Sequence, residues 1–133
     1  MLILNNLGDI GLLILRIVIG IIFIYHGLPK LLNSSKMSAG IGMSATFIFI
    51  LGLVEILGGL GSILGLYTQI AAIILSIVML GAIYNKMFVW NVPFSKSGVI
   101  GWEFDLMILG GILALLFLGS GNISIDSLIG LYP

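Results

Sequence analysis

Apolar residues fill four long stretches of the chain, and shorter polar segments separate them. The stretches cover residues 11–32, 45–66, 69–87 and 102–119. Each is close to the ~20 residues that a helix needs to cross the hydrocarbon core of a bilayer. We therefore expect an all-α fold in a single domain, an integral membrane bundle of four antiparallel helices.

The connections between these stretches differ in length, and this difference constrains the topology. Only Gly65-Leu66-Tyr67-Thr68 joins the second stretch to the third, so these two helices must form a tight antiparallel hairpin. The other two loops are longer, and with four spans both lie on one side and both termini on the other. The tail, residues 120–133, contains an apolar segment that is too short to span, and we expect it to lie in the membrane interface.

Composition supports a lipid environment and excludes several functions. The chain is 60% hydrophobic and 8% charged, whereas soluble domains carry about 25% charged residues. Five basic and five acidic side chains give no net charge, so we expect no nucleic-acid partner. Cysteine is absent, which excludes disulfides, thiolate-held iron–sulfur clusters and a dithiol relay within the chain.

The distribution of charge predicts an orientation in the cell membrane. Four lysines lie on the long-loop side: Lys30, Lys36, Lys86 and Lys96. The terminal side carries Asp9 and Asp126, and its basic residue, Arg16, lies inside the first span. The positive-inside rule then places the long loops in the cytoplasm and both termini outside, in a multi-pass topology.

Two charged residues lie well inside the predicted spans, away from the span ends, where insertion of a charge costs about 2.5–3.5 kcal/mol. Arg16 lies in the first span and Glu55 near the middle of the second. Because these spans are antiparallel neighbours, we expect an Arg16–Glu55 ion pair that faces the bundle interior, with Gln69 completing its hydrogen bonds.

Small residues share a helical face with these charges. The predicted inner faces are Arg16, Gly20, Phe23, Gly27 and Lys30 on the first span, and Gly52, Glu55, Gly59 and Ser62 on the second. Glycines on such faces allow helix backbones to approach closely. Two interpretations of the buried charges stay open: a structural clamp, or a polar site for a proton, a quinone head group or another small polar ligand.

A second polar cluster is predicted at the long-loop end. Its members are His26, Lys30, Asn85, Lys86, Trp102, Glu103 and Asp105. We expect Asp105 to face inward towards Lys30 or His26, and Glu103 to face the interface. Interfacial charge pairing is favoured over catalysis as the role of this cluster.

Ligands for a metal or haem are scarce. One histidine and no cysteine argue against a haem, zinc or copper site held by this chain alone. We expect no cofactor bound by this chain alone, with quinone as the candidate ligand. Any catalysis would use a bound organic molecule or a cofactor of a partner.

Several segments together resemble the DoxX family of small membrane proteins. They are Leu15-Arg16-Ile17-Val18-Ile19-Gly20, His26-Gly27-Leu28-Pro29-Lys30-Leu31, Leu53-Val54-Glu55-Ile56-Leu57-Gly58-Gly59, Gly65-Leu66-Tyr67-Thr68, Trp102-Glu103-Phe104-Asp105-Leu106 and Gly119-Ser120-Gly121-Asn122-Ile123-Ser124-Ile125-Asp126. The resemblance runs over residues 11–126 in the family's order. It implies a four-helix membrane domain related to the membrane subunit of thiosulfate:quinone oxidoreductase.

Three functional hypotheses follow. The leading one is an accessory subunit of a larger membrane redox complex, quinone-linked or oxidase-type, that is not catalytic alone. The alternative is a quinone-binding subunit of a thiosulfate:quinone oxidoreductase-like enzyme, in which Arg16, Glu55 and Gln69 form the site. A stand-alone carrier of small solutes ranks third. The expected partners are the lipid bilayer and either other membrane subunits or further copies of this chain.

Overall fold

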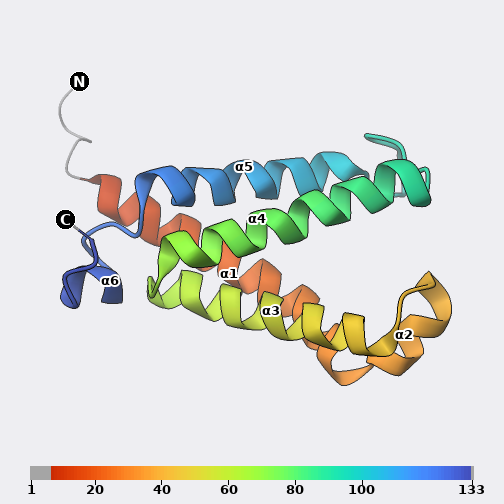
Figure 1. The fold of residues 1–133 in the computed structure, drawn as a ribbon. Coiled ribbons are helices and arrows are strands. Elements are labelled where there is room, and N and C mark those ends of the chain that lie inside the picture. Colours follow the sequence, from red (N-terminus) through yellow and green to blue (C-terminus); the bar gives the residue numbers. More distant parts are fainter. Residues whose placement is uncertain (1–6, 133) are drawn as a thin grey trace.

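The computed structural model describes residues 7–132, and within them the chain is helical apart from loops and one isolated bridge between Lys96 and Val99. The α-helices are α1 (Gly8–Leu32), α2 (Ser34–Ile41), α3 (Ala45–Leu64), α4 (Thr68–Tyr84), α5 (Trp102–Leu118) and α6 (Ile125–Leu128). A π-helical segment, η2 (Asn85–Val89), extends α4 (Figure 1).

The all-α prediction is confirmed for the described residues, whereas the number of helices differs from four. Three helical stretches are long and apolar enough to cross a membrane: Gly8–Leu32, Ala45–Leu64 and Thr68–Val89. The helix α5 has 17 residues and is the fourth of the longer helices. The short helices α2 and α6 fall in segments that we expected to be a loop and an interfacial turn. The residues outside 7–132 leave both ends of the predicted 1–133 domain undescribed.

Glycines bring α1 and α3 into backbone contact along the predicted faces. A Cβ atom at Gly52 would lie 2.7 Å from the Gly27 carbonyl oxygen, and one at Gly59 would lie 2.8 Å from the Gly20 carbonyl oxygen. Any larger side chain at these positions would separate the helices. The close approach that small residues permit in membrane helices is therefore confirmed here.

The tight hairpin between α3 and α4 is also confirmed. It turns through Gly65 and Tyr67, which have φ of 64° and 48°, the left-handed region that glycine adopts without steric cost. Figure 1 shows the resulting arrangement, in which α1 lies beside α3 and α4 beside α5. We refer to these as the α1–α3 pair and the α4–α5 pair.

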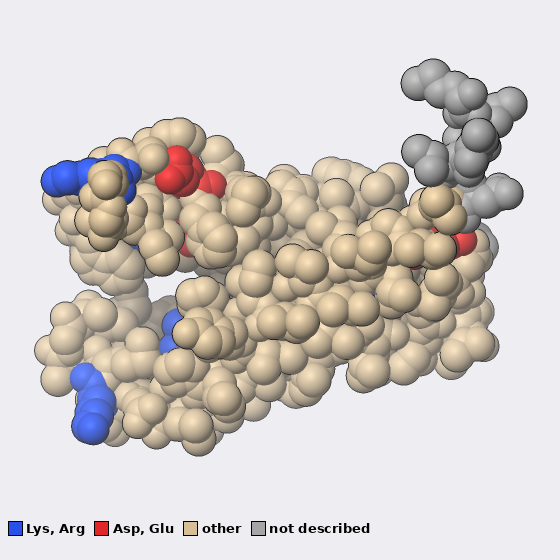
Figure 2. Space-filling view, turned by 180° about the vertical axis from the view of Figure 1, so that it is seen from behind, with Lys and Arg blue, Asp and Glu red and all other residues tan. Residues whose placement is uncertain are grey.

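The core lies between the two pairs. Its fully buried members include Leu75 of α4 and Ile112 of α5, and Phe23 of α1 packs against the same cluster. Large apolar side chains are also exposed on the outer faces of every long helix. An apolar exterior of this kind is what a lipid environment requires, and Figure 2 shows that charged side chains gather at the two ends of the molecule.

Candidate functional site

The buried charges do not form the expected Arg16–Glu55 pair, and that prediction is wrong. Glu55 instead accepts hydrogen bonds from the Lys30 ammonium, with its two carboxylate oxygens 2.5 and 2.6 Å from Lys30 Nζ. The helix register gives the reason. Gly20 faces Gly59 and Gly27 faces Gly52, so Glu55 lies level with residue 24, and Arg16 is eight residues (24 − 16) or ~12 Å farther along α1.

The Lys30–Glu55 pair joins the long-loop end of α1, which carries Lys30, to the middle of α3. Its carboxylate lies near the middle of α3 and is almost fully buried, with 4% of the side chain exposed, whereas 21% of the Lys30 side chain is exposed. The lysine reaches inward from the last turn of α1 because Gly52 leaves room for its stem. A charge at this depth is stable only when it is neutralised and hydrogen-bonded, and this pair provides both.

The α4–α5 pair carries a separate ion pair. Lys86 Nζ lies 2.6 Å from Asp105 Oδ2, as an ion contact without aligned hydrogen-bond geometry. We expected Asp105 to face Lys30 or His26, and this prediction is wrong. Lys86 belongs to the π-helical segment η2 at the end of α4, beside the first turn of α5.

The remaining members of the predicted long-loop cluster make separate interactions. Glu103 is exposed, as expected, and accepts a hydrogen bond from Ser95 (2.9 Å). The Asn85 amide donates to the Gly81 carbonyl of its own helix at 2.9 Å. His26 packs edge-on against Tyr25, and Trp102 against Phe94. The residues of the predicted cluster therefore form separate pairwise contacts and do not come together in one polar site.

Arg16 forms a second buried centre at the terminal end. The residue is 0% exposed, and its Nη2 donates to the Ile123 carbonyl in the tail. Its guanidinium lies against Gly65, where no Cβ atom could fit. Nε and Nη1 have no hydrogen-bond partner in the described part of the chain, and the backbone N–H of Asp126 is bonded to the carbonyl of the same Gly65.

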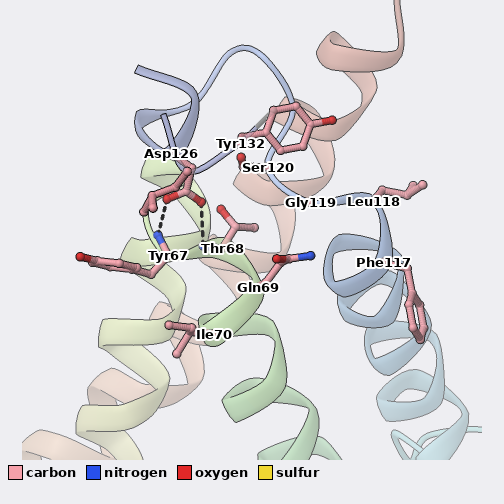
Figure 3. A pocket seen from close by; sticks show the side chains of 11 residues that line it. Tyr67, Thr68, Gln69, Ile70, Phe117, Leu118, Gly119, Ser120, Asp126 and Tyr132 are labelled. Carbon is pink, nitrogen blue, oxygen red and sulfur yellow. Dashed lines mark hydrogen bonds between the residues drawn. The ribbon is translucent and has the colours of Figure 1, made fainter. Parts of the chain in front are cut away.

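Asp126 closes the tail over the α3–α4 hairpin. Its carboxylate accepts hydrogen bonds from the backbone N–H groups of Tyr67 (2.7 Å) and Thr68 (2.9 Å), at the start of α4 (Figure 3). The N–H of Asp126 donates to the Gly65 carbonyl at 2.8 Å. A carboxylate at a helix N-terminus satisfies free N–H groups and interacts favourably with the helix dipole. Sequence reasoning missed this role. The available indication was that Asp126 is the only charged residue in the tail, residues 120–133.

A pocket of about 510 Å³ opens beside this closure, between the start of α4, the end of α5 and the tail. Figure 3 shows Thr68, Gln69, Phe117, Ser120, Asp126 and Tyr132 around it. The Gln69 amide donates to the Leu116 carbonyl of α5 at 3.0 Å, so the predicted bond from Gln69 to the Arg16–Glu55 pair is wrong. The Thr68 hydroxyl is buried and has no partner within residues 7–132.

In the part of the chain that the structure describes, these sites contain single ion pairs and single hydroxyl groups, without a cluster of metal ligands. Among the described residues, no three histidine, cysteine or acidic side chains come together in a way that could hold a metal ion. What the structure offers instead is two ion pairs with buried carboxylates and partly exposed lysines, a buried guanidinium and one pocket with a free hydroxyl donor.

The chain is similar to three bacterial proteins. It is 29% identical to the Bacillus subtilis protein named "Putative oxidoreductase CatD", over 92% of this chain and 89% of the relative. It is 32% identical to "Uncharacterized membrane protein Rv3486" of Mycobacterium tuberculosis, over 90% and 81% of the two chains. An uncharacterized Haemophilus influenzae protein is 32% identical, over 85% and 86%.

No solved structure is detectably similar to the chain. Residues 11–92, which include most of α1 and all of α2, α3 and α4, match the DoxX family. With these relatives covered over most of their length, the chain belongs to the DoxX family of membrane proteins.

Proposed function

We propose that the chain crosses the membrane four times, with α5 as the fourth span. Its 17 residues correspond to ~25 Å, slightly less than the ~30 Å hydrocarbon core. Exposed apolar side chains on α5, including Met107 and Phe117, support this assignment. The long loops then face the cytoplasm, because the four lysines lie at that end.

In the membrane the chain serves as an accessory subunit of a redox complex. The observation that carries this proposal is the Lys30–Glu55 pair, which neutralises a charge near mid-membrane from within the chain. A helix cluster with internal neutralisation is suited to hold partner subunits in lipid through its apolar faces. The name of the Bacillus subtilis relative supports the redox context.

Quinone handling is the second candidate function, and the terminal-end pocket favours it. The pocket is apolar in part and contains Gln69 and the free Thr68 hydroxyl, groups suited to a carbonyl-bearing ring. In this version of the hypothesis Arg16 and Glu55 belong to different sites, and Glu55 contributes as a buried proton-exchanging group.

Purification of the tagged chain from its native membranes in mild detergent tests the leading proposal. We expect redox subunits to co-migrate with the chain on native gels, and a chain that migrates only with further copies of itself would contradict the proposal.

The variant Glu55→Gln then separates the two candidates. An accessory role predicts lower stability and abundance with unchanged quinone reduction per assembled complex. Quinone handling predicts reduced turnover in complexes that assemble normally. The matched control is Glu103→Gln, because Glu103 is exposed and bonded to Ser95.

A further inference from the structure

We infer that the terminal-end pocket binds one uncharged amphiphile, whose head group presents a carbonyl or hydroxyl oxygen to Thr68 and whose tail lies against α4 and α5. The inference rests on the membrane placement proposed above. It concerns the ligand class of this pocket and does not depend on whether the chain has redox partners.

The first observation is the Thr68 hydroxyl. Thr68 is only 1% exposed, its backbone N–H is bonded to Asp126, and its Oγ1 has no partner within the described chain. Figure 3 shows this side chain pointing towards the tail segment that carries Ser120 and Asp126. Buried hydroxyls without partners are costly and rare, so a donor left free at the wall of a pocket indicates a missing acceptor.

Charge in the pocket selects a neutral head group. Asp126 is the charged side chain among the lining residues, and each of its oxygens already accepts a backbone N–H. An anionic head group would face the Asp126 charge, because the nearest basic side chain, Arg16, lies against Gly65 and is not among the residues that line the pocket. A cationic head group would compete with two hydrogen bonds that cap α4. An uncharged head group meets neither cost.

The shape of the pocket suits an amphiphile. Its volume of about 510 Å³ is within the range of small-ligand sites, roughly 300–1,000 Å³. Polar Thr68 and Ser120 lie at its buried side, whereas Ile70, Phe117 and Leu118 at its rim are more than half exposed. A molecule bound here would place its polar end under the tail and its hydrocarbon along the apolar rim, parallel to lipid chains.

Photo-crosslinking of the full chain in phosphatidylcholine nanodiscs tests the inference. Three probes carry the same diazirine-bearing tail on different head groups: a benzoquinone, a monoacylglycerol and a phosphatidate. We expect at least one uncharged probe to label peptides spanning residues 117–132 about fivefold more than the phosphatidate does. The preferred uncharged probe identifies the source of the ligand, a quinone or a neutral glycerolipid.

Thr68 variants provide the decisive comparison. Thr68→Val keeps the shape and removes the donor, so labelling by the preferred probe should fall about fivefold, the loss expected for one hydrogen bond. Thr68→Ser, which keeps the hydroxyl, should retain the labelling. The control is Thr46→Val at the chain's only other threonine, which is exposed at the opposite end of α3.

Several outcomes would overturn the inference. They are labelling dominated by the phosphatidate, labelling spread evenly over the lipid-facing helices, and Thr68→Val labelling equal to that of Thr68→Ser. The last would mean that the hydroxyl is satisfied by water alone. Co-purification of redox subunits is unaffected by these outcomes, so this inference can fail while the proposed accessory role stands, and the converse also holds.

Discussion

The two ends of the bundle are held together in different ways. At the terminal end, bonds to the backbone join elements from both helix pairs: Arg16 of α1 binds the Ile123 carbonyl, and Asp126 caps α4 at the hairpin. At the long-loop end, side-chain ion pairs act within each pair, Lys30–Glu55 in one and Lys86–Asp105 in the other. Figure 2 shows the surface hollowed between the pairs at this second end.

The two kinds of interaction therefore connect different parts of the bundle. Backbone bonds from the tail tie the α1–α3 pair to the α4–α5 pair, because the donors and acceptors come from segments far apart in the sequence. The ion pairs hold each helix pair internally, and neither ion pair connects the α1–α3 pair to the α4–α5 pair. We expect substitutions at the terminal end to have the larger effects.

The largest effect is expected for Gly65→Ala. The new methyl group would overlap the Arg16 guanidinium and lie 2.6 Å from Ser124 Cβ, and alanine is strained at φ 64°. Strain and overpacking together should lower the free energy of unfolding by about 4 kcal/mol. Denaturation in mixed dodecyl maltoside and SDS micelles, monitored by circular dichroism, measures this loss in the free energy of unfolding.

The control for this change is Gly42→Ala. Gly42 has φ 72° but nothing within 4 Å of a Cβ atom, so this variant isolates the backbone strain. We expect a loss of about 1–2 kcal/mol. Equal losses in the two variants would mean that the contact between Arg16 and Gly65 contributes nothing to the closure of the terminal end.

A smaller loss is expected for Asp126→Asn. The amide keeps one acceptor oxygen and places a donor against one of the two N–H groups at the start of α4, so the free energy of unfolding should fall by about 2 kcal/mol. The same melting assay applies. Asp9→Asn is the matched control, since Asp9 bonds Asn122 in an exposed position and should matter less.

The smallest effect is expected at the long-loop end, for Asp105→Asn. This change removes the charge that faces Lys86. Because the Lys86 side chain is 20% exposed and can turn to water, the free energy of unfolding should fall by about 1 kcal/mol. Glu103→Gln, on the exposed side of the same helical turn, should change stability by less than about 0.5 kcal/mol. A loss at Asp105 larger than at Asp126 would reverse the proposed ranking of the two ends.

Hydropathy was sufficient to locate the long helices. The predicted stretch 45–66 compares with Ala45–Leu64, and 102–119 with Trp102–Leu118. The glycine faces of α1 and α3 also follow from helical periodicity. The short helix α2 could not be predicted in this way, because Ser34–Ile41 is too polar to resemble a membrane span.

The pairing of charges could not be predicted in the same way. Periodicity gives the face of a helix on which Arg16 and Glu55 lie, but not the axial offset between two helices. Backbone contacts at glycines fix that offset here and bring Glu55 to Lys30. The capping role of Asp126 depends on a fold-back of the tail that no local pattern specifies.

The cap on α4 also sets an order of events during synthesis. Thr68 and Asp126 are 58 residues apart, so the ribosome needs about 3–12 s after making the hairpin before its cap emerges. Until then the first N–H groups of α4 lack their carboxylate, and Arg16 lacks the Ile123 carbonyl. The hairpin is therefore synthesised before the residues that cap it, and the C-terminal residues finish a structure begun near the middle of the chain.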